Sequence, residues 1–208
     1  MYIPEHYRMP EPDVAAFLAE TRTGTLVTVA AGRPVATFLP WTLVDGDRLT
    51  SHLALVNPQA AADGEALVIL MGADAYVSDE WMGDGAAPTW DYETVHLVGD
   101  LTLHRDPDWI ISSWDDLLRR FSHRTAADYD PSWLERTARA VVGVEFRIRE
   151  VQAKSKLSQK ESAATVRSIA DHLAPACPRL SARLEAVSLP HIAARDERVQ
   201  AARPYTRP

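Results

Sequence analysis

The sequence has little of what marks secreted, membrane-spanning or zinc-binding proteins. It contains one cysteine, Cys177, which cannot form an intramolecular disulfide and has no Cys-x-x-Cys partner for zinc. No apolar run approaches a membrane span, and the first ten residues lack the apolar core of a signal peptide. These absences predict a protein of the reducing cytoplasm that does not enter a membrane.

Positive charge is also scarce. The chain carries 22 Lys and Arg against 29 Asp and Glu, which gives a formal net charge of −7. DNA-binding proteins usually present a basic face, because neutralising phosphates supplies much of their affinity. The balance therefore argues against a nucleic-acid surface spread over the whole protein, although Lys and Arg gather in the last third.

Several catalytic signatures are absent as well. The sequence has no nucleophile elbow, Walker loop, Gly-rich dinucleotide fingerprint or two-His metal pair, so hydrolase and nucleotide-triphosphatase functions lose support. Hydrophobic residues make up 46% of the chain and charged residues 25%, which excludes disorder of the whole chain. A length of 208 residues fits one domain, with or without a helical appendage.

What the sequence does have is a series of short apolar segments separated by turn residues. Asp13 is predicted to be the N-cap of a short helix that ends near Thr21. Proline cannot donate to a sheet ladder, so Pro40 marks an edge or a bulge, and Gly72 is expected to break a strand. Apolar and alternating patterns predict strands over 25–29, 34–43, 48–53, 66–71, 75–78, 95–103 and 142–151.

Helices are expected mainly in the second half. Asp106-Pro107 and Pro131 each begin one, and the Ser158–Glu161 spacing is that of a capping box for a helix over 158–173. About seven strands with short turns predict a mainly β (α+β) fold, a closed antiparallel barrel with peripheral helices. The expected organisation is a barrel domain, a C-terminal helical extension and a frayed tail, over 1–155, 156–190 and 191–208.

Polar groups interrupt two of the apolar strands. Residues 36–41 are one such segment and end in Pro40 and Trp41. An edge strand with a surface tryptophan would show the same pattern without any functional role. In residues 51–59, a hydroxyl, an imidazole and two amides could hold a phosphate or a ring edge, or His52 could ligate a metal or haem iron. A hydrogen-bonded structural role for His52 stays open.

Two further segments carry aromatic or basic side chains. Trp90 and Tyr92, in an expected loop over 87–96, could wall a flat cofactor ring or could pack that loop onto the barrel. Lysines in 154–160, just before the predicted helix, could form a small anion site, because free N–H groups and the helix dipole favour negative charge. A solvated basic connector is the alternative.

Taken together and in this order, the segments resemble the PaiB family of FMN-binding negative transcriptional regulators. The likeness spans roughly residues 1–170. The matching stretches are 1–7, 25–29, 34–40, 52–54, 57–59, 75–78, 88–92, 95–96, 140–145 and 156–159. The resemblance implies an FMN-binding split barrel, a homodimer with flavin mononucleotide at its interface, and a DNA partner through the family label alone.

The resemblance also implies a cofactor-binding set, without assigning a catalytic residue. Its members are Thr37, Leu39, Ser51, His52, Leu53, Asn57, Trp90, Lys154, Lys156 and Gln159. Leu55 and Val56 stand where family members commonly have Arg-Ala, which removes a bidentate phosphate donor. The 79–87 loop looks shortened, and Lys160 stands where an Asn is common, so the flavin site could be remodelled or lost.

Two alternatives accompany the flavin hypothesis. Haem-dependent piperazate synthases are relatives that share the barrel, and similarity to them implies haem b with His52 as axial ligand and N–N bond formation on N5-hydroxyornithine. The other alternative is a dimeric barrel that has lost its cofactor. Whether the protein is an enzyme, a transcriptional regulator or a flavin-dependent redox protein stays open at this point.

Overall fold

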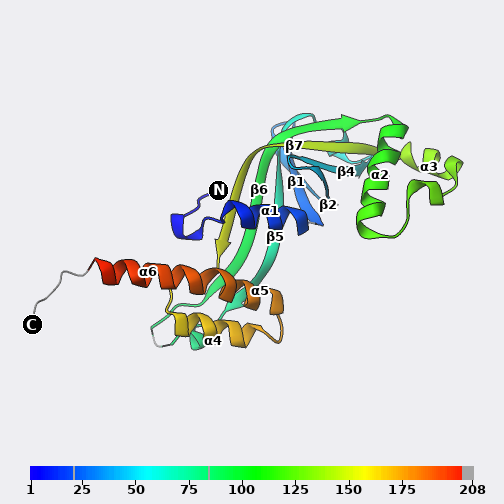
Figure 1. The fold of residues 1–208 in the computed structure, drawn as a ribbon. Helices are drawn as coiled ribbons and strands as arrows, with labels where there is room; N and C mark the ends of the chain where they lie inside the picture. Colours follow the sequence, from blue (N-terminus) through cyan, green and yellow to red (C-terminus); the bar gives the residue numbers. More distant parts are fainter. Residues whose placement is uncertain (21, 84, 203–208) are drawn as a thin grey trace, which may run out of the picture. The chain divides into compact units, whose positions relative to one another are not determined.

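The computed structural model describes residues 1–20, 22–83 and 85–202, and its centre is a seven-stranded antiparallel sheet (Figure 1). The strand order is β2-β1-β5-β6-β7-β4-β3. The strands are β1 Thr23–Ala30, β2 Arg33–Pro40, β3 Thr42–Asp45, β4 Arg48–Ala54, β5 Gly64–Val77, β6 Thr89–His104 and β7 Val141–Lys156. A mainly β fold with peripheral helices is therefore confirmed.

Helices lie before, between and after the strands. Their bounds are α1 Glu11–Glu20, α2 Pro107–Phe121, α3 Pro131–Ala138, α4 Ala163–Leu173, α5 Pro178–Arg183 and α6 Leu189–Ala201, with a π-helical turn, η5, at Leu184–Ser188. Short 3-10 turns are η1 Glu5–Tyr7, η2 Pro58–Ala61, η3 Asp79–Trp81 and η4 Ala126–Asp128. No helix among the described residues is both long enough and apolar enough to cross a membrane.

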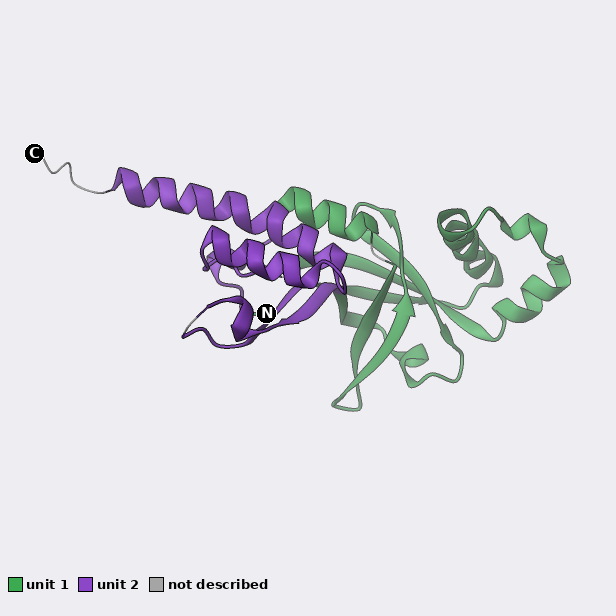
Figure 2. Cartoon of the chain, turned by 90° about the horizontal axis from the view of Figure 1, so that it is seen from below, with its two compact units in different colours: residues 1, 10–70, 95–152 green, residues 2–9, 71–94, 153–208 purple. Residues whose placement is uncertain are grey.

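The chain forms two compact units (Figure 2). Unit 1 comprises residues 1, 10–70 and 95–152, and unit 2 comprises residues 2–9, 71–94 and the described residues from 153 onward. Strands β5, β6 and β7 each contribute residues to both units. The expected division at 155/156 remains a prediction.

Unit 1 is organised by the hairpin of β1 and β2, in which Thr25 pairs with Phe38 and Val27 with Ala36. Ala31 and Gly32, with φ of 51° and 74°, form the turn, because two positive φ values give the twist that a two-residue hairpin needs. Helices α2 and α3 lie side by side in this unit. The interior of the unit contains the fully buried Trp41, whose ring meets that of Phe146 edge-on at 6.3 Å.

Trp41 corrects two expectations. The single strand predicted over 34–43 is two strands, since the ladder of β2 ends at Pro40, which has no N–H to donate. Trp41 then donates its own N–H to the Arg22 carbonyl at 2.9 Å and is buried, so it is not a surface tryptophan. Pro40 does lie on an edge strand, as predicted.

Three other strand predictions were wrong in extent. Gly72 does not break a strand, because β5 runs through it, as a glycine weakens a strand without ending it. The loop expected over 87–96 is strand from Thr89 onward, and β7 continues to Lys156. Along β7, Val144 and Phe146 are fully buried and Val151 is 41% exposed, because odd and even positions of a strand face opposite ways.

Helix ends also differ from the sequence patterns. Helix α1 begins at Glu11 and ends at Glu20, so Asp13 lies in its first turn and is not its N-cap, and Thr21 lies outside the described residues. Helix α4 begins at Ala163 behind Ser162, whose hydroxyl accepts from Thr165 N at 3.1 Å, so the Ser158–Glu161 capping box does not form. The tail expected to be frayed from 191 is helical to Ala201 in α6.

Unit 2 has its own apolar core. Helices α4, α5 and α6 and the π-helical turn between α5 and α6 pack on one another there. The buried cluster joins Val77 of β5 and Leu157 to side chains from these helices, namely Val166, Ile169, Leu173, Leu180, Leu184 and Ile192. The C-terminal helices are therefore part of a packed unit with strand residues at its base.

A close approach in unit 1 provides a stability test. A Cβ added at Gly143 would lie 2.3 Å from Trp109 Cζ3 and 3.2 Å from Ile110 Cγ1. We expect Gly143→Ala to lower the free energy of unfolding by about 1–3 kcal/mol, because overpacking forces α2 away from β7. Urea denaturation measures this change. Gly46→Ala, whose Cβ would meet nothing within 4 Å, is the control, and equal stability of both variants would contradict the packing.

Candidate functional site

A hydrogen-bonded cluster in unit 1 joins β1 and β2 to the 3-10 turn η2 and its N-cap residue Asn57. Gln59 is fully buried, and its Nε2 donates to Thr28 Oγ1 at 3.0 Å and to the Val35 carbonyl at 3.1 Å. The Thr37 hydroxyl donates to Gln59 Oε1, and Asn57 Nδ2 donates to Thr37 Oγ1 at 3.1 Å. The second N–H of Asn57 Nδ2 has no partner among the described residues, so the cluster offers a fixed donor.

A guanidinium group lies against the same turn. Arg105, just beyond β6, donates from Nη2 to the carbonyl of Ala60 in η2 at 2.8 Å. In the described part of the chain no carboxylate pairs with this side chain. Arg105 is thus an exposed cation next to the Asn57–Gln59 turn, and the sequence analysis did not identify it.

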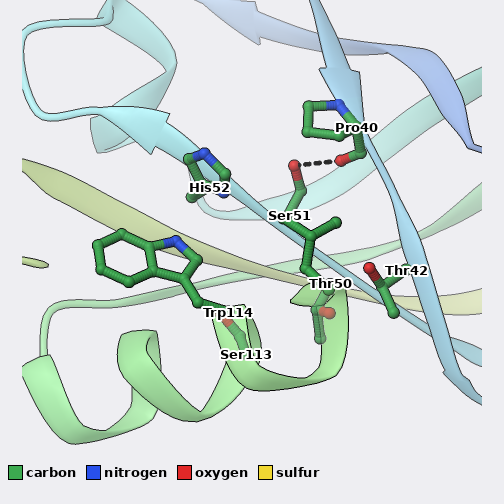
Figure 3. A pocket seen from close by; sticks show the side chains of 8 residues that line it. Pro40, Thr42, Thr50, Ser51, His52, Ser113 and Trp114 are labelled. Carbon is green, nitrogen blue, oxygen red and sulfur yellow. Dashed lines mark hydrogen bonds between the residues drawn. The ribbon is translucent and has the colours of Figure 1, made fainter. Parts of the chain in front are cut away.

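His52 lies on β4 beside α2 (Figure 3). Its ring meets that of Trp114 edge-on at 6.1 Å, and the neighbouring Ser51 Oγ donates to the Pro40 carbonyl at 2.6 Å. Burial lowers the pKa of His52, so the imidazole is neutral at pH 7. A neutral imidazole is the form that ligates iron and that can both donate and accept a hydrogen bond.

The cavity beside His52 is small. Its volume is about 10 Å³, and Pro40, Ser51, His52 and Trp114 are among the residues that line it. Such a space holds about one water molecule, so it does not accommodate a porphyrin or a flavin ring. Among the described residues there is also no cluster of three or more His, Cys, Asp or Glu that could hold a metal ion.

Two leucines of the predicted set belong to the core. Leu39 is 6% exposed and Leu53 is 1% exposed, so only their backbone is available to a ligand. By contrast, Leu55 and Val56 are 46% and 91% exposed, next to Asn57. An apolar surface thus occupies the position at which the expected arginine is missing.

Lys156 has a structural partner in unit 2, the fully buried Asp91 of β6. Lys156 Nζ donates to Thr89 Oγ1 and to the Trp90 carbonyl, both at 2.6 Å, and lies 3.5 Å from Asp91 Oδ1. Ser158 Oγ donates to the other carboxylate oxygen of Asp91 at 2.6 Å. All three ammonium protons are therefore used within the protein, which argues against Lys156 as a phosphate ligand.

The other predicted residues of unit 2 also have partners. Lys154 Nζ lies over the rings of Tyr7 and Tyr92, 5.8 and 5.3 Å from their centroids. Gln159 is 3% exposed. Its Oε1 accepts from the Leu157 N–H, and its Nε2 donates to the Ser155 carbonyl. Trp90 is 51% exposed, and its Nε1 donates to Asp74 at 2.8 Å.

The predicted set thus divides between the two units. Thr37, Leu39, Ser51, His52, Leu53 and Asn57 lie in unit 1, whereas Trp90, Lys154, Lys156 and Gln159 lie in unit 2. Sequence reasoning missed Asp91 as the partner of Lys156, Gln59 as the centre of the unit 1 cluster, and Arg105 beside it. A signal existed for Gln59 and Asp91, since both lie inside polar segments singled out in the sequence, but none marked Arg105.

Comparison with known proteins identifies related chains. The family model described as "Putative FMN-binding domain" matches residues 1–150. The sequence is 30% identical over 174 residues to the "Protease synthase and sporulation protein PAI 2" of Bacillus subtilis, with 78% of this chain and 84% of that protein covered.

Solved structures show the same fold. A conserved hypothetical protein from Mycobacterium tuberculosis matches with a TM-score of 0.56 and 18% identity over 75% of this chain and 91% of that one. The FAD and heme binding protein from Mycobacterium smegmatis matches with a TM-score of 0.53 and 19% identity over 73% and 74%. These likenesses confirm the expected split-barrel fold.

The buried pair of Asp91 and Lys156 predicts a pH-dependent loss of stability. Burial raises the pKa of Asp91, although Ser158 and Lys156 counteract the increase. Removing the ammonium in Lys156→Met leaves a buried carboxylate without a counterion, which we expect to cost about 3–5 kcal/mol of unfolding free energy at pH 7. Lys160→Met, which removes an exposed side chain, is the matched control.

The direction of the pH effect follows from the raised pKa. The folded state binds the Asp91 proton more tightly than the unfolded state, so this group supports folding at low pH and loses that contribution as pH rises through its folded pKa. The cost of Lys156→Met, measured by urea denaturation, should therefore shrink between pH 7 and about pH 4. A cost that is unchanged or larger in acid would contradict the assignment.

Proposed function

This chain belongs to the PaiB family, and we propose that it binds flavin mononucleotide between two copies of unit 1. The observation that carries the proposal is the fixed polar cluster of Thr37, Asn57 and Gln59 with Arg105 against the same turn. All four residues lie within the stretch that the family model matches, 1–150. A donor amide next to a guanidinium suits a ligand with a polar ring edge and a phosphate.

Arg105 is the candidate phosphate ligand. A guanidinium can donate two parallel N–H bonds to phosphate, and only one nitrogen of Arg105 is engaged by Ala60. This side chain would take the role that the resemblance assigns to the arginine missing at Leu55. Asn57 would donate its remaining N–H, and the neutral His52 would add a further polar edge.

The chemistry that a bound flavin supplies is one- or two-electron transfer. The chain's own residues would bind and orient it, because Gln59 holds Thr37 and Asn57 in place from the interior of the sheet. Which molecule exchanges electrons with the flavin, and whether a regulatory role accompanies it, remain predictions of the family label.

An apolar sheet face in unit 1 supports the homodimer. Val29 and Phe38 are 70% and 69% exposed. Phe38 pairs with Thr25, which pairs in turn with Ile69 of β5, so all three side chains emerge on one face. A second copy of this face would cover it, and a flat ring would then lie between two protein surfaces instead of inside the small cavity beside His52.

Haem remains the second candidate cofactor. The cavity beside His52 is too small for a macrocycle, as it is for a flavin ring, so haem too would have to lie outside this cavity. The neutral imidazole of His52, a form that can ligate haem iron, is the feature that supports this alternative. A Soret band in the purified protein that is lost in His52→Ala would establish it, whereas bands in the near-ultraviolet and blue would establish flavin.

The phosphate assignment predicts a selective loss of affinity. In Arg105→Met the dissociation constant for flavin mononucleotide should rise by roughly tenfold or more, as expected when a hydrogen bond to a charged group is lost. Affinity for riboflavin, which lacks the phosphate, should stay unchanged. Quenching of flavin fluorescence measures both constants.

Arg139→Met is the matched control for this experiment, because that side chain is 72% exposed and, among the described residues, pairs with Glu135 alone, at 4.0 Å. Equal losses for flavin mononucleotide and riboflavin, or no loss for either, would rule out Arg105 as the phosphate ligand.

The dimer proposal predicts that Phe38→Glu produces monomers. A carboxylate in the centre of the apolar face would be desolvated in the dimer without a counterion, which is costly. Analytical ultracentrifugation should show half the mass of the unaltered protein, and flavin binding should weaken with it. Val199→Glu alters an apolar residue of α6 that is 52% exposed, and it should leave the mass unchanged. An unaltered mass in Phe38→Glu would place the interface elsewhere.

A further inference from the structure

Unit 2 contains a cavity that the flavin proposal does not use. Its volume is about 590 Å³, which lies within the range typical of small-molecule sites. The residues that form it include the loop 85–89 and the side chains of Tyr7, Lys156, Ser158, Lys160 and Glu161. The last four lie beyond residue 150, where the match to the flavin family model ends.

The turn over 158–161, which carries the charges of the cavity, is fixed by hydrogen bonds to Arg195 and Asp91. Arg195 of α6 donates to the carbonyls of Lys160 at 3.0 Å and Glu161 at 3.3 Å. Ser158 at the start of the turn has a positive φ of 58° and is fixed through its hydroxyl to Asp91. A surface turn that is fixed by hydrogen bonds at both ends presents its side chains in a defined arrangement.

Two opposite charges on this turn are unpaired. Lys160 and Glu161 both line the cavity, and in the described part of the chain neither side chain has a hydrogen bond or an ion pair. Lys160 is close enough to His6 for its charge to help lower the pKa of that imidazole, after the larger effect of burial. The remaining lysine of the cavity, Lys156, is already compensated by Asp91.

Tyr7 adds a neutral polar group. Burial, together with the negative charges of Asp91 and Glu161, raises the pKa of this phenol, so it stays protonated at neutral pH. Its hydroxyl has no hydrogen-bond partner among the described residues, and its ring is held by Lys154. Among the described residues of the cavity, the charged side chains without a partner are therefore one cation and one anion, and the Tyr7 hydroxyl adds a neutral donor.

We propose that this cavity binds a zwitterionic small molecule of the amino-acid class, with its carboxylate at Lys160 and its ammonium group at Glu161. A simple anion would be repelled by Glu161, and a simple cation would be repelled by Lys160. A zwitterion satisfies both, and the Tyr7 hydroxyl can donate to its carboxylate. The proposal does not depend on flavin, because none of these residues belongs to the unit 1 cluster.

Three probes that differ only in charge test the proposal. Norleucine carries both charged groups, hexanoate carries the carboxylate alone, and pentylamine carries the ammonium group alone. We expect norleucine to bind the full chain at least about tenfold more tightly than either of the others, because each charged group contributes its own hydrogen bonds. Isothermal titration calorimetry and chemical-shift changes measure this, with flavin absent and then present.

Charge-removing variants assign the two ends. Lys160→Met should remove the advantage of norleucine over pentylamine, and Glu161→Gln should remove its advantage over hexanoate. Arg167→Met removes an exposed charge of α4 that does not line the cavity, and should leave all three affinities unchanged. Circular dichroism and melting temperature verify that each variant is folded.

Three results would overturn the proposal. The first is no binding of norleucine at about 10 mM to folded protein, since that corresponds to less than about 3 kcal/mol of binding free energy. The second is hexanoate or pentylamine binding as tightly as norleucine, and the third is an affinity for norleucine that both variants leave intact. Flavin binding is measured separately in the same samples, so a failure here is distinguishable from a failure of the flavin proposal.

Discussion

A buried side-chain amide must be hydrogen bonded through both its nitrogen and its oxygen. In unit 1 the amide of Gln59 meets this requirement, and its hydrogen bonds hold the neighbouring elements together. Its nitrogen is satisfied by β1 and β2, and its oxygen by Thr37. Leaving either end unpaired would cost about 1–3 kcal/mol. The turn that carries Gln59 therefore cannot move away from the hairpin, and Asn57, two residues earlier, is held with it.

In unit 2 the buried polar group that needs partners is a carboxylate, Asp91, instead of an amide. Asp91 is fully buried, and Lys156 and Ser158 compensate it from the end of β7 and the turn that follows. A lysine that would otherwise be free to bind a ligand thereby becomes part of the structure. The basic segment at the end of β7 is thus divided between residues that stabilise the fold and one, Lys160, whose charge faces a cavity.

Alternation and turn chemistry allowed the sheet to be predicted from the sequence, and tertiary packing explains where the prediction was wrong. The strand patterns at 25–29 and 142–151 are local, because one face of each strand is buried, and both lie inside observed strands. Nothing local indicates that Trp41 is buried between β2 and β3, or that β5 continues through Gly72, since both depend on distant partners. The helical tail in α6 was missed for the same reason, as Ile192 is buried against other helices of unit 2.

The candidate site shows the same division between local and distant information. Polar residues inside apolar strands marked Thr37, His52 and Asn57, but Arg105 is separated from Asn57 in the sequence by two strands, β5 and β6, and has no motif of its own. The most direct test of the account is a crystal structure of the protein with flavin mononucleotide. It should place the phosphate within hydrogen-bond distance of Arg105 and Asn57, on a face covered by a second copy of the chain. A flavin found in the unit 2 cavity, or bound with Arg105 facing solvent, would contradict it.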